Sequence, residues 1–331
     1  MDLDLLEKTL ADAGEPGFRA KQVWEWACSG VRSYGEMTNL PKPLRQRLQA
    51  EVPFSTLIAA DTALASDRTE KVLFNTLDGR PIETVLMRYR DGRRSVCVSS
   101  QSGCPLTCNF CATGRMAFGR NLTASEILDQ VLHFRRTDNV NHLVFMGMGE
   151  PLMNLDAVIE ASERLPDAGV ATSHTTVSTV GWIPGIERLA TEGPRIRLAL
   201  SLHSAEGDVR SQLMPVNDKY PLHDVIESCL RWREHRGKRV YVEYLMLANV
   251  NDQTEQAEVL AEVLKPREAW KVNLIPYNPT PGRYTGSDRE TIEDFQRVLR
   301  EKGIPNTVRL TRGRDIAAAC GQLAVERAGV A

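Results

Sequence analysis

The part of the chain that begins at residue 94 alternates between two apolar patterns, and this alternation limits the fold more than any other feature. Short runs rich in β-branched and aromatic residues follow one another: SVCVSS, HLVFMG, HTTVST, RLALSLH, RVYVEYLML, WKVNLIP and NTVRL. Helix-period segments separate them, such as TASEILDQVLHFRR, where Thr123 and Glu126 form a capping box, and DRETIEDFQRVLREKG, which ends on Gly303. Repeated βα units with right-handed crossovers predict an α/β fold whose parallel sheet curls into a full or partial barrel.

The first ~90 residues have a different pattern. Helical spacing covers residues 2–13 and 18–28, and a third short helix follows the proline-bounded turn NLPKPL. Apolar alternation in EKVLFNT and IETVLMRY, around the turn LDGRP, predicts a hairpin. We therefore divide the chain into a helical accessory domain, a hairpin linker region, a barrel and a C-terminal segment, at residues 1–55, 56–92, 93–311 and 312–331.

Composition excludes several classes of protein. With 331 residues, 42% hydrophobic and 25% charged, the chain can bury one large core plus a small accessory unit. The N-terminus MDLDLLEKTLADAG does not have the pattern of a signal peptide, and no apolar stretch approaches the ~20 residues needed to cross a bilayer, so we expect no membrane association. Seven cysteines, three of them clustered, are not typical of a secreted disulfide framework and favour the cytoplasm.

Basic residues give no global sign of a nucleic-acid partner, because the net charge is −2. Two local groups are more basic. The first could contact phosphates or could be a solvated helix face, and it consists of Lys42, Arg45 and Arg47, with Arg19 and Lys21 nearby. The second precedes an expected C-terminal helix and consists of Arg309, Arg312 and Arg314.

Three cysteines in the segment SGCPLTCNFCATG have the spacing C-x3-C-x2-C. Cys104, Cys108 and Cys111 can hold three irons of a 4Fe–4S cluster and leave the fourth iron free for a substrate or cofactor. The alternative is a structural zinc site, which prefers two pairs of ligands. The next histidine, His133, lies 22 residues further on in a predicted helix, where a packing role is the default. The spacing therefore favours the cluster.

Polar residues follow several predicted strands, at the end of the barrel where sites gather. Glu150 lies in the glycine-rich turn MGMGEP, where it could bind an amine or a ribose. Ser178, Ser201, His203 and Asn278 end three other strands. Each alone is more often a cap or a core polar group, but together they favour a binding pocket.

The other four cysteines are scattered. Cys28 and Cys229 fall on apolar helix faces and are expected to be buried small hydrophobes. Cys97 lies on the strand that leads into the cluster loop, and Cys320 precedes a glycine in RGRDIAAACGQL. By itself, Cys320 is best interpreted as a core residue.

Together these motifs resemble the radical S-adenosylmethionine (SAM) enzymes, and within them the RlmN and Cfr group of RNA adenosine methyltransferases. The resemblance covers nearly the whole chain. GEPGFRAKQVWEW with EMTNLP is similar to the family's accessory, RNA-binding domain, CVSSQSGCPLTCNFCATG to its cluster region, and DIAAACGQL to its terminal segment. The resemblance implies a radical SAM core, which is a partial (β/α)6 TIM-like barrel.

The resemblance also implies a role for each matching residue. Cys104, Cys108 and Cys111 would ligate the 4Fe–4S cluster, whose open iron binds SAM. The SAM pocket would be lined by Gly149, Glu150, Ser178, Ser201, Leu202, His203 and Asn278. Cys320 would carry the methyl group and Cys97 would be its resolving partner. Glu83, in PIETVLM, matches the proposed proton acceptor, although the segment between Glu83 and Cys97 is one residue longer than in the family.

The implied reaction uses two SAM molecules per turnover. One would methylate the Cys320 thiolate, and the second would yield a 5′-deoxyadenosyl radical that takes hydrogen from this methyl group. The carbon radical would add to an adenine ring, Glu83 would remove the ring proton, and Cys97 would release the product with a disulfide left behind. The implied partners are 23S rRNA, tRNA and an electron donor such as flavodoxin or ferredoxin, and we expect a monomer.

Several alternatives stay open. Pro151 in GMGEP resembles the RlmN branch, which acts on carbon 2 of adenosine, whereas Ser204 in SLHS leans toward the Cfr branch, which acts on carbon 8 and confers antibiotic resistance. A radical SAM enzyme that activates a glycyl radical enzyme would leave Cys97 and Cys320 without a role. The non-enzyme alternative is a zinc-stabilised RNA-binding protein.

Overall fold

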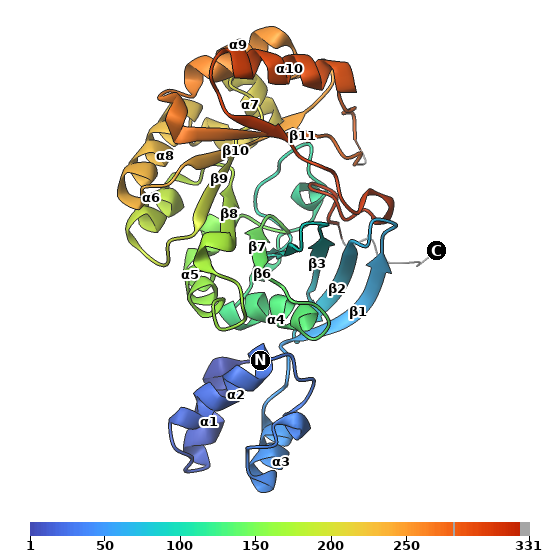
Figure 1. The fold of residues 1–331 in the computed structure, drawn as a ribbon, viewed down its shortest axis with the longest axis vertical. Coiled ribbons are helices and arrows are strands. Elements are labelled where there is room, and N and C mark those ends of the chain that lie inside the picture. Colours follow the sequence, from blue (N-terminus) through green and yellow to red (C-terminus); the bar gives the residue numbers. More distant parts are fainter. Residues whose placement is uncertain (281, 325–331) are drawn as a thin grey trace.

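A ten-stranded sheet forms the centre of the molecule (Figure 1). The structure is a computed structural model that describes residues 1–280 and 282–324. Strand order in the sheet is β1-β2-β3-β4-β7-β8-β9-β10-β11-β12. Its parallel strands are β4 (Arg94–Cys97), β7 (His142–Phe145), β8 (Thr175–Thr179), β9 (Arg197–Ser201), β10 (Val240–Met246), β11 (Trp270–Pro276) and β12 (Asn306–Val308). All strands predicted after residue 94 are therefore present in the predicted order, and the α/β fold is confirmed.

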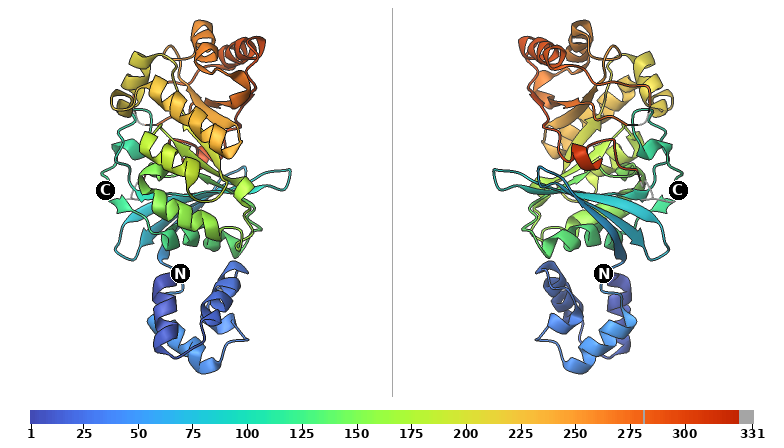
Figure 2. Two further views of the ribbon diagram at one scale, coloured as in Figure 1. Left: turned by 90° about the vertical axis from the view of Figure 1, so that its left-hand side faces the viewer. Right: turned by 90° about the vertical axis from the view of Figure 1, so that its right-hand side faces the viewer.

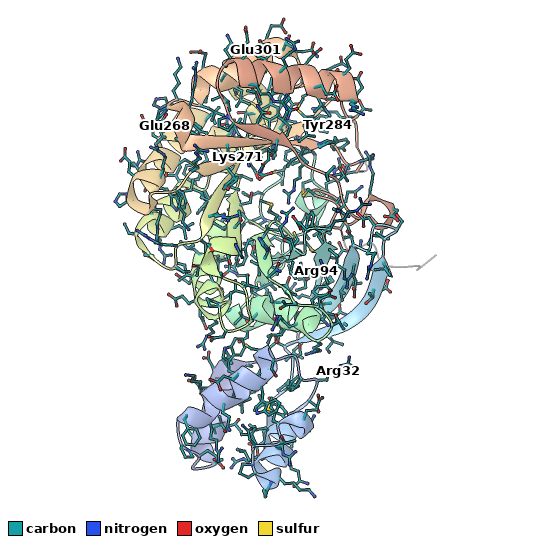
Figure 3. The ribbon with its side chains drawn as sticks, viewed as in Figure 1. Arg32, Arg94, Glu268, Lys271, Tyr284 and Glu301 are labelled. Atoms are coloured by element: carbon teal, nitrogen blue, oxygen red, sulfur yellow. The ribbon has the colours of Figure 1, made fainter. Side chains whose placement is uncertain are left out.

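Helices cover the outer side of the parallel strands (Figures 1 and 2), and side chains fill the space between the two layers (Figure 3). They are α4 (Ala124–Arg135), α5 (Leu155–Arg164), α6 (Ile183–Thr191), α7 (Gly207–Leu213), α8 (Leu222–Arg236), α9 (Thr254–Val263) and α10 (Arg289–Glu301). The predicted capping box of α4 is confirmed, because Thr123 Oγ1 accepts from Glu126 N at 3.1 Å and Glu126 Oε2 accepts from Thr123 N at 2.9 Å. His133 on this helix packs against Phe74, with ring centroids 4.9 Å apart, as its default role predicted.

Three antiparallel strands extend the sheet beyond β4. They are β1 (Leu57–Leu64), β2 (Glu70–Thr76) and β3 (Pro81–Arg88), and β3 pairs with β4 so that Val85 lies opposite Cys97. The predicted hairpin is β2–β3, and it continues the barrel sheet instead of standing apart from it. The sequence did not predict β1, because this edge strand is mostly exposed and has no apolar alternation.

The N-terminal helices form a separate layer at one end of the molecule (Figure 2). This helical unit comprises α1 (Leu3–Asp12), α2 (Phe18–Cys28), a 3-10 turn (Tyr34–Glu36) and α3 (Lys42–Glu51). Leu6, Val23 and Leu48 from the three α-helices are fully buried and form its core. Trp24 Nε1 donates to Asp167 Oδ2 at 2.8 Å, which attaches the helical unit to the barrel.

The barrel is open on one side. Within residues 1–280 and 282–324, β1 and β12 each pair with one strand only, so the sheet does not close. Over the same residues, the helices are too short or too polar to span a membrane. The expected C-terminal helix is replaced, as far as residue 324, by a 3-10 turn (Arg314–Ile316) and further turns, and the rest of the predicted segment, 325–331, lies outside the described residues.

Candidate active site

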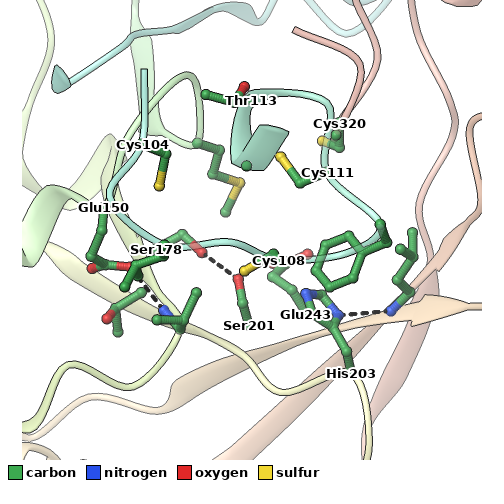
Figure 4. A pocket seen from close by; sticks show the side chains of 18 of the residues that line it. Cys104, Cys108, Cys111, Thr113, Glu150, Ser178, Ser201, His203, Glu243 and Cys320 are labelled. Atoms are coloured by element: carbon green, nitrogen blue, oxygen red, sulfur yellow. Dashed lines mark hydrogen bonds between the residues drawn. The ribbon is translucent and has the colours of Figure 1, made fainter. Parts of the chain in front are cut away.

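A cavity of about 150 Å³ lies at the C-terminal ends of the parallel strands (Figure 4). Parallel strands end at the same edge of a sheet, so loops that are far apart in the sequence meet there. Nine predicted site residues line this cavity: Cys104, Cys108, Cys111, Gly149, Glu150, Ser178, Ser201, His203 and Cys320. Residues from the loops after β4, β7, β8 and β9 and from the C-terminal segment are therefore brought together as the sequence predicted.

The loop after β4 carries the three clustered cysteines. A two-stranded ribbon of β5 (Gln101–Ser102) and β6 (Arg120–Asn121) joins the two ends of this cluster loop. A Cβ atom at Gly114 would lie 2.8 Å from the Cys108 carbonyl oxygen, so this turn requires glycine. The loop is also bonded to the C-terminal segment, because Ala112 N donates to Gly321 O at 2.8 Å.

The side chains of Cys104, Cys108 and Cys111 enter the cavity from three sides (Figure 4). Burial raises the pKa of the Cys104 thiol to about 12, and the neighbouring carboxylate of Glu150 and thiol of Cys111 raise it further. The pKa of Cys108 lies well above its usual range for the same reason, burial first and the two other thiols next. Thiols must lose their protons to bind a metal, and a bound cation would supply the charge that makes this loss favourable.

This arrangement fits an iron–sulfur cluster. Among the described residues, no three His, Cys, Asp or Glu side chains are grouped as ligands of a single metal ion. A 4Fe–4S cluster makes a different demand, because each cysteine binds a separate iron atom and the thiolates surround the whole cluster. Three thiols from one loop around one cavity meet this demand and leave a fourth iron for another ligand.

The turn after β7 holds a buried carboxylate beside the cysteines. Gly149 has φ of +101°, and a Cβ there would lie 2.6 Å from the Gln101 Cβ. The Glu150 carboxylate accepts hydrogen bonds from Leu152 N at 3.1 Å and Val180 N at 3.0 Å. Burial still raises the pKa of Glu150 to about 7. Such a carboxylate, which forms no ion pair with any described residue, is suited to bind an ammonium group.

Polar groups from the next two strands face Glu150 across the cavity (Figure 4). The hydroxyls of Ser178 and Ser201 lie 3.2 Å apart. His203 has φ of +57° and its Nδ1 accepts from Leu245 N at 3.1 Å. Burial, with a smaller effect of Arg210, lowers the pKa of His203 to about 3, so the imidazole is neutral and its second nitrogen carries the proton.

A second, smaller cavity adjoins the first, and Met146, Ile275, Arg309 and Cys320 line both. Cys97 and Asn278 line the second cavity, and Asn278 Nδ2 donates to Cys320 O at 3.3 Å. Burial raises the pKa of Cys97 to about 12, the Cys320 thiol raises it further and Arg309 opposes them. Both cysteines are free thiols.

Two predicted residues do not line either cavity. Leu202 is fully buried, and its carbonyl oxygen accepts from Arg210 Nε at 3.2 Å. Glu83 on β3 is buried and forms an ion pair with Lys71, 2.9 Å between Nζ and Oε1. Glu83 lies two residues before Val85, which lines the second cavity, so the two side chains share one face of the strand. The predicted roles of Leu202 and Glu83 remain predictions.

The sequence did not identify Arg210 and Glu243, and it singled out Arg309 only as a member of a local basic group. Arg210 is fully buried, and it donates to Val180 O at 2.6 Å and Asn217 Oδ1 at 2.6 Å, so it holds the loops after β8 and β9 together. Arg309 Nη1 lies 3.4 Å from Glu243 Oε2, and the charge of Cys320 raises the pKa of Arg309. Glu243 could have been found, because it is a single carboxylate inside an apolar strand. Arg210 lies in a short helix without any motif.

The basic residues of the helical unit pair mostly with acids one turn away. Arg19 lies 3.1 Å from Glu15, Arg47 lies 3.0 Å from Glu51 and Lys21 lies 3.9 Å from Glu25. These i,i+4 pairs are typical of a solvated helix face.

Comparisons with known proteins agree with the geometry. Residues 98–260 match the Radical SAM superfamily, and residues 1–53 match the ribosomal RNA large subunit methyltransferase N-terminal domain. A protein of Heliobacterium modesticaldum named “Probable dual-specificity RNA methyltransferase RlmN” is 45% identical over 94% of this chain and 84% of its own length. A protein of the same name from Chloroflexus aurantiacus is 44% identical, over 98% of this chain and 91% of its own length. The crystal structure of a radical SAM methyltransferase from Sphaerobacter thermophilus has a TM-score of 0.91 at 43% identity and covers 97% of both chains.

Proposed function

This chain belongs to the RlmN family of dual-specificity RNA methyltransferases, within the radical SAM superfamily, and we propose that it methylates carbon 2 of an adenosine in 23S rRNA and in tRNA. One observation carries the proposal. Cys97 and Cys320 are 223 positions apart in the sequence, yet they line one cavity directly beside the three clustered cysteines. A radical SAM enzyme without a cysteine methyl carrier would not need this pair.

Carbon 2 of adenine is an electron-poor amidine carbon, so it is a poor nucleophile toward the methyl sulfonium of SAM. The bound cluster and two SAM molecules would supply a methyl group, an electron and a 5′-deoxyadenosyl radical able to take hydrogen from that methyl group. The residues of this chain would have to hold these reagents, exclude water and move protons between defined atoms.

Cys104, Cys108 and Cys111 would hold the cluster, and the residues around Glu150 would hold SAM. The buried Glu150 carboxylate would pair with the SAM ammonium group, which restores the charge balance that burial disturbs. Gly149 would let the backbone approach the ligand, and Ser178, Ser201 and His203 would bind polar groups of the ribose and base. Leu202 and Asn278 would complete the wall of the pocket.

Cys320 would carry the methyl group, and Cys97 would attack the Cys320 sulfur to release the methylated base. Arg309 supports this assignment, because its guanidinium lies close enough to both sulfur atoms to favour their thiolates. The Cys97–Cys320 disulfide would exist only between turnovers, and both thiols are free in this structure. Glu83 would accept the ring proton, which its side of β3 permits.

We assign RNA binding to the helical unit, with domain boundaries at residues 1–55, 56–92, 93–311 and 312–331. A cytoplasmic flavodoxin or ferredoxin would reduce the cluster, and the enzyme would act as a monomer.

The decisive experiment is mass spectrometry of nucleosides from 23S rRNA and tRNA after anaerobic incubation with reconstituted protein, SAM and a reductant. We expect 2-methyladenosine in both RNAs. Product at carbon 8 would keep the mechanism but assign the chain to the Cfr activity. Cys320→Ala should abolish methylation while iron content and SAM cleavage survive, whereas methylation by this variant would refute the carrier role. Protein that binds zinc and no iron would refute the proposal as a whole.

A further inference from the structure

A third cavity lies at the opposite end of the barrel from the clustered cysteines. Its volume is about 470 Å³, within the range of ~300–1,000 Å³ that is typical of ligand pockets. Many of its lining residues come from the starts of the parallel strands, for example His142 on β7, Thr176 on β8, Arg197 on β9 and Lys271 on β11. Figure 3 labels Lys271 near the start of β11. The cavity is therefore the N-terminal mouth of the barrel lumen.

One layer of side chains separates the two ends of the lumen, in which Arg309 Nη1 lies 3.4 Å from Met146 Sδ and 3.4 Å from Glu243 Oε2. Alternate residues of a strand face the same side, and along β10 these residues are Tyr241, Glu243 and Leu245. Tyr241 lines the mouth, Leu245 lines the cysteine cavity, and Glu243 lines both. Met146 and Arg309 also line both cavities. Closed TIM barrels fill this space with several layers of large apolar side chains, but here a single, partly polar layer lies between the mouth and the cavity that Cys320 lines.

Cations dominate the mouth. Arg197 and Lys271 line it, and within the described residues their side chains have no hydrogen-bond or ion-pair partner. Arg93 and Arg309 also line the mouth, but they form ion pairs with Asp91, at 2.9 Å, and with Glu243, at 3.4 Å. Glu243 is the one carboxylate among the lining residues. Two unpaired cations in a concave polar site would attract an anion.

More cations surround the mouth. Burial lowers the pKa of Lys238, and the nearby charges of Arg197, Arg195 and Arg236 lower it further, so these four cations lie close together. This concentration contrasts with the overall net charge of −2. A local group of cations therefore adjoins Arg197, as expected where a polyanion binds.

Flat side chains stand beside these cations. The Arg93 and Arg312 guanidinium groups lie 4.2 Å and 5.0 Å from the ring centroid of Tyr89, which lines the mouth. His142 and His174 are stacked, with ring centroids 4.2 Å apart. Aromatic, imidazole and guanidinium planes are the groups on which unstacked RNA bases stack.

The other end of the barrel is covered by bonded loops. Ala112 N in the cluster loop donates to Gly321 O at 2.8 Å, and Thr113 Oγ1 donates to Leu323 O at 2.5 Å. Asn109 N in the same loop donates to Leu213 O of α7 at 2.9 Å. The cluster loop, α7 and the C-terminal segment therefore form a lid, which a nucleotide could not pass without breaking these bonds.

From the charge, the single layer that separates the mouth from the cysteine cavity, and this lid, we infer that the N-terminal mouth of the barrel is the RNA entrance. Arg197 and Lys271 bind phosphates that flank the target adenosine. The extruded adenine passes Tyr241 and Thr176, and the Arg309 side chain moves aside from Met146 and Glu243 to let it reach Cys320. An enzyme that acts on a base must take it out of its stack and into a pocket, and the lumen is such a pocket. This inference rests on the proposed function, since it assumes an RNA substrate.

The test compares two double variants of the reconstituted holoenzyme. Arg197→Gln/Lys271→Gln removes two charges at the mouth, and Arg289→Gln/Lys302→Gln removes two at the two ends of α10, away from the mouth. Binding of a fluorescent RNA hairpin with the target adenosine is measured by anisotropy over a range of KCl concentrations. The mouth variant should bind at least tenfold more weakly, and its slope of log K against log salt should be shallower by about 1 for each lost phosphate contact. The control should match the wild type.

The results distinguish a wrong RNA entrance from a wrong function. SAM cleavage without RNA is measured for every variant, and wild-type rates show that the fold and cluster are intact. A mouth variant with wild-type affinity and salt slope, beside a wild-type enzyme that methylates RNA, would overturn the entrance and leave the function standing. A wild-type enzyme that cleaves SAM but neither binds nor methylates RNA would overturn both.

A third variant tests the passage itself. Thr176→Phe places a ring in the lumen without changing the charge. We expect it to lose at least tenfold in kcat/KM for RNA methylation and to keep wild-type SAM cleavage and RNA affinity. If Thr176→Phe methylates RNA at the wild-type rate, the base does not pass through the lumen, and the inference is wrong.

Discussion

Glu150→Gln should make the protein more stable at pH 8 and also unable to bind SAM well. The carboxylate is buried, and burial raises its pKa from an ordinary 4.5 to about 7. The folded state therefore holds a proton that the unfolded state has lost between these two pH values. Since the folded state binds more protons there, the free energy of unfolding falls as pH rises through this window, and the wild type pays this cost in full above pH 7.

The size of the effect follows from the pKa difference. A change from 4.5 to about 7 corresponds to about 3 kcal/mol. Glutamine has one carbonyl oxygen, so it can replace only one acceptor for Leu152 N and Val180 N, at a cost of about 1–2 kcal/mol. The variant should thus be about 1–2 kcal/mol more stable than the wild type at pH 8. At pH 5 the wild type keeps only about 0.8 kcal/mol of its cost, so the variant should be less stable by up to about 1 kcal/mol.

Urea unfolding of the cluster-free protein under reducing conditions at pH 5 and pH 8 measures this difference. The comparison holds if wild type and variant have the same m-value, the dependence of the unfolding free energy on urea concentration. Glu160→Gln on the exposed face of α5 is the matched control and should stay within about 0.5 kcal/mol of the wild type. SAM affinity of the holoenzyme should fall by about tenfold or more in Glu150→Gln, because a charge-assisted hydrogen bond is lost. If the effect of Glu150→Gln on unfolding is the same at both pH values, the raised pKa and the reasoning built on it are refuted.

Three further variants test the cluster ligands, the SAM turn and the capping of α4. Cys108→Ser should lose most of its bound iron and acid-labile sulfide, whereas Cys229→Ser, at a fully buried thiol on α8, should keep both. Gly149→Ala should lower the free energy of unfolding by about 1–3 kcal/mol or more, because φ is +101° and a Cβ would lie 2.6 Å from a neighbouring side chain; Gly207→Ala, with open space around it, should not. Thr123→Ala should cost about 1 kcal/mol in urea unfolding, and no measurable loss would show that the capping box does not stabilise α4.

The fold was predictable from sequence where burial leaves a pattern. Helices cover the outer face of the parallel strands, so HLVFMG and WKVNLIP keep buried apolar residues at alternate positions, such as Leu143 and Val272. The exposed edge strand β1 has no such pattern, and its position depends on backbone pairing with β2. The cysteine spacing and the strand-end residues predicted the cavity, because strand ends meet at one edge of the sheet. Arg210 could not be predicted, since the carbonyl groups that it binds belong to loops that meet only in the folded barrel.

Met146, Glu243 and Arg309 form a single layer between the two ends of the lumen, and the rest of each strand belongs to one end or the other. A substitution at Tyr241 or Lys271 can change what enters the barrel without touching the residues at the strand ends, two or four positions further along the same strand. The same scaffold could therefore acquire new substrates by changes at one end while the radical machinery at the other stays constant. Only the shared layer would be under selection from both sides.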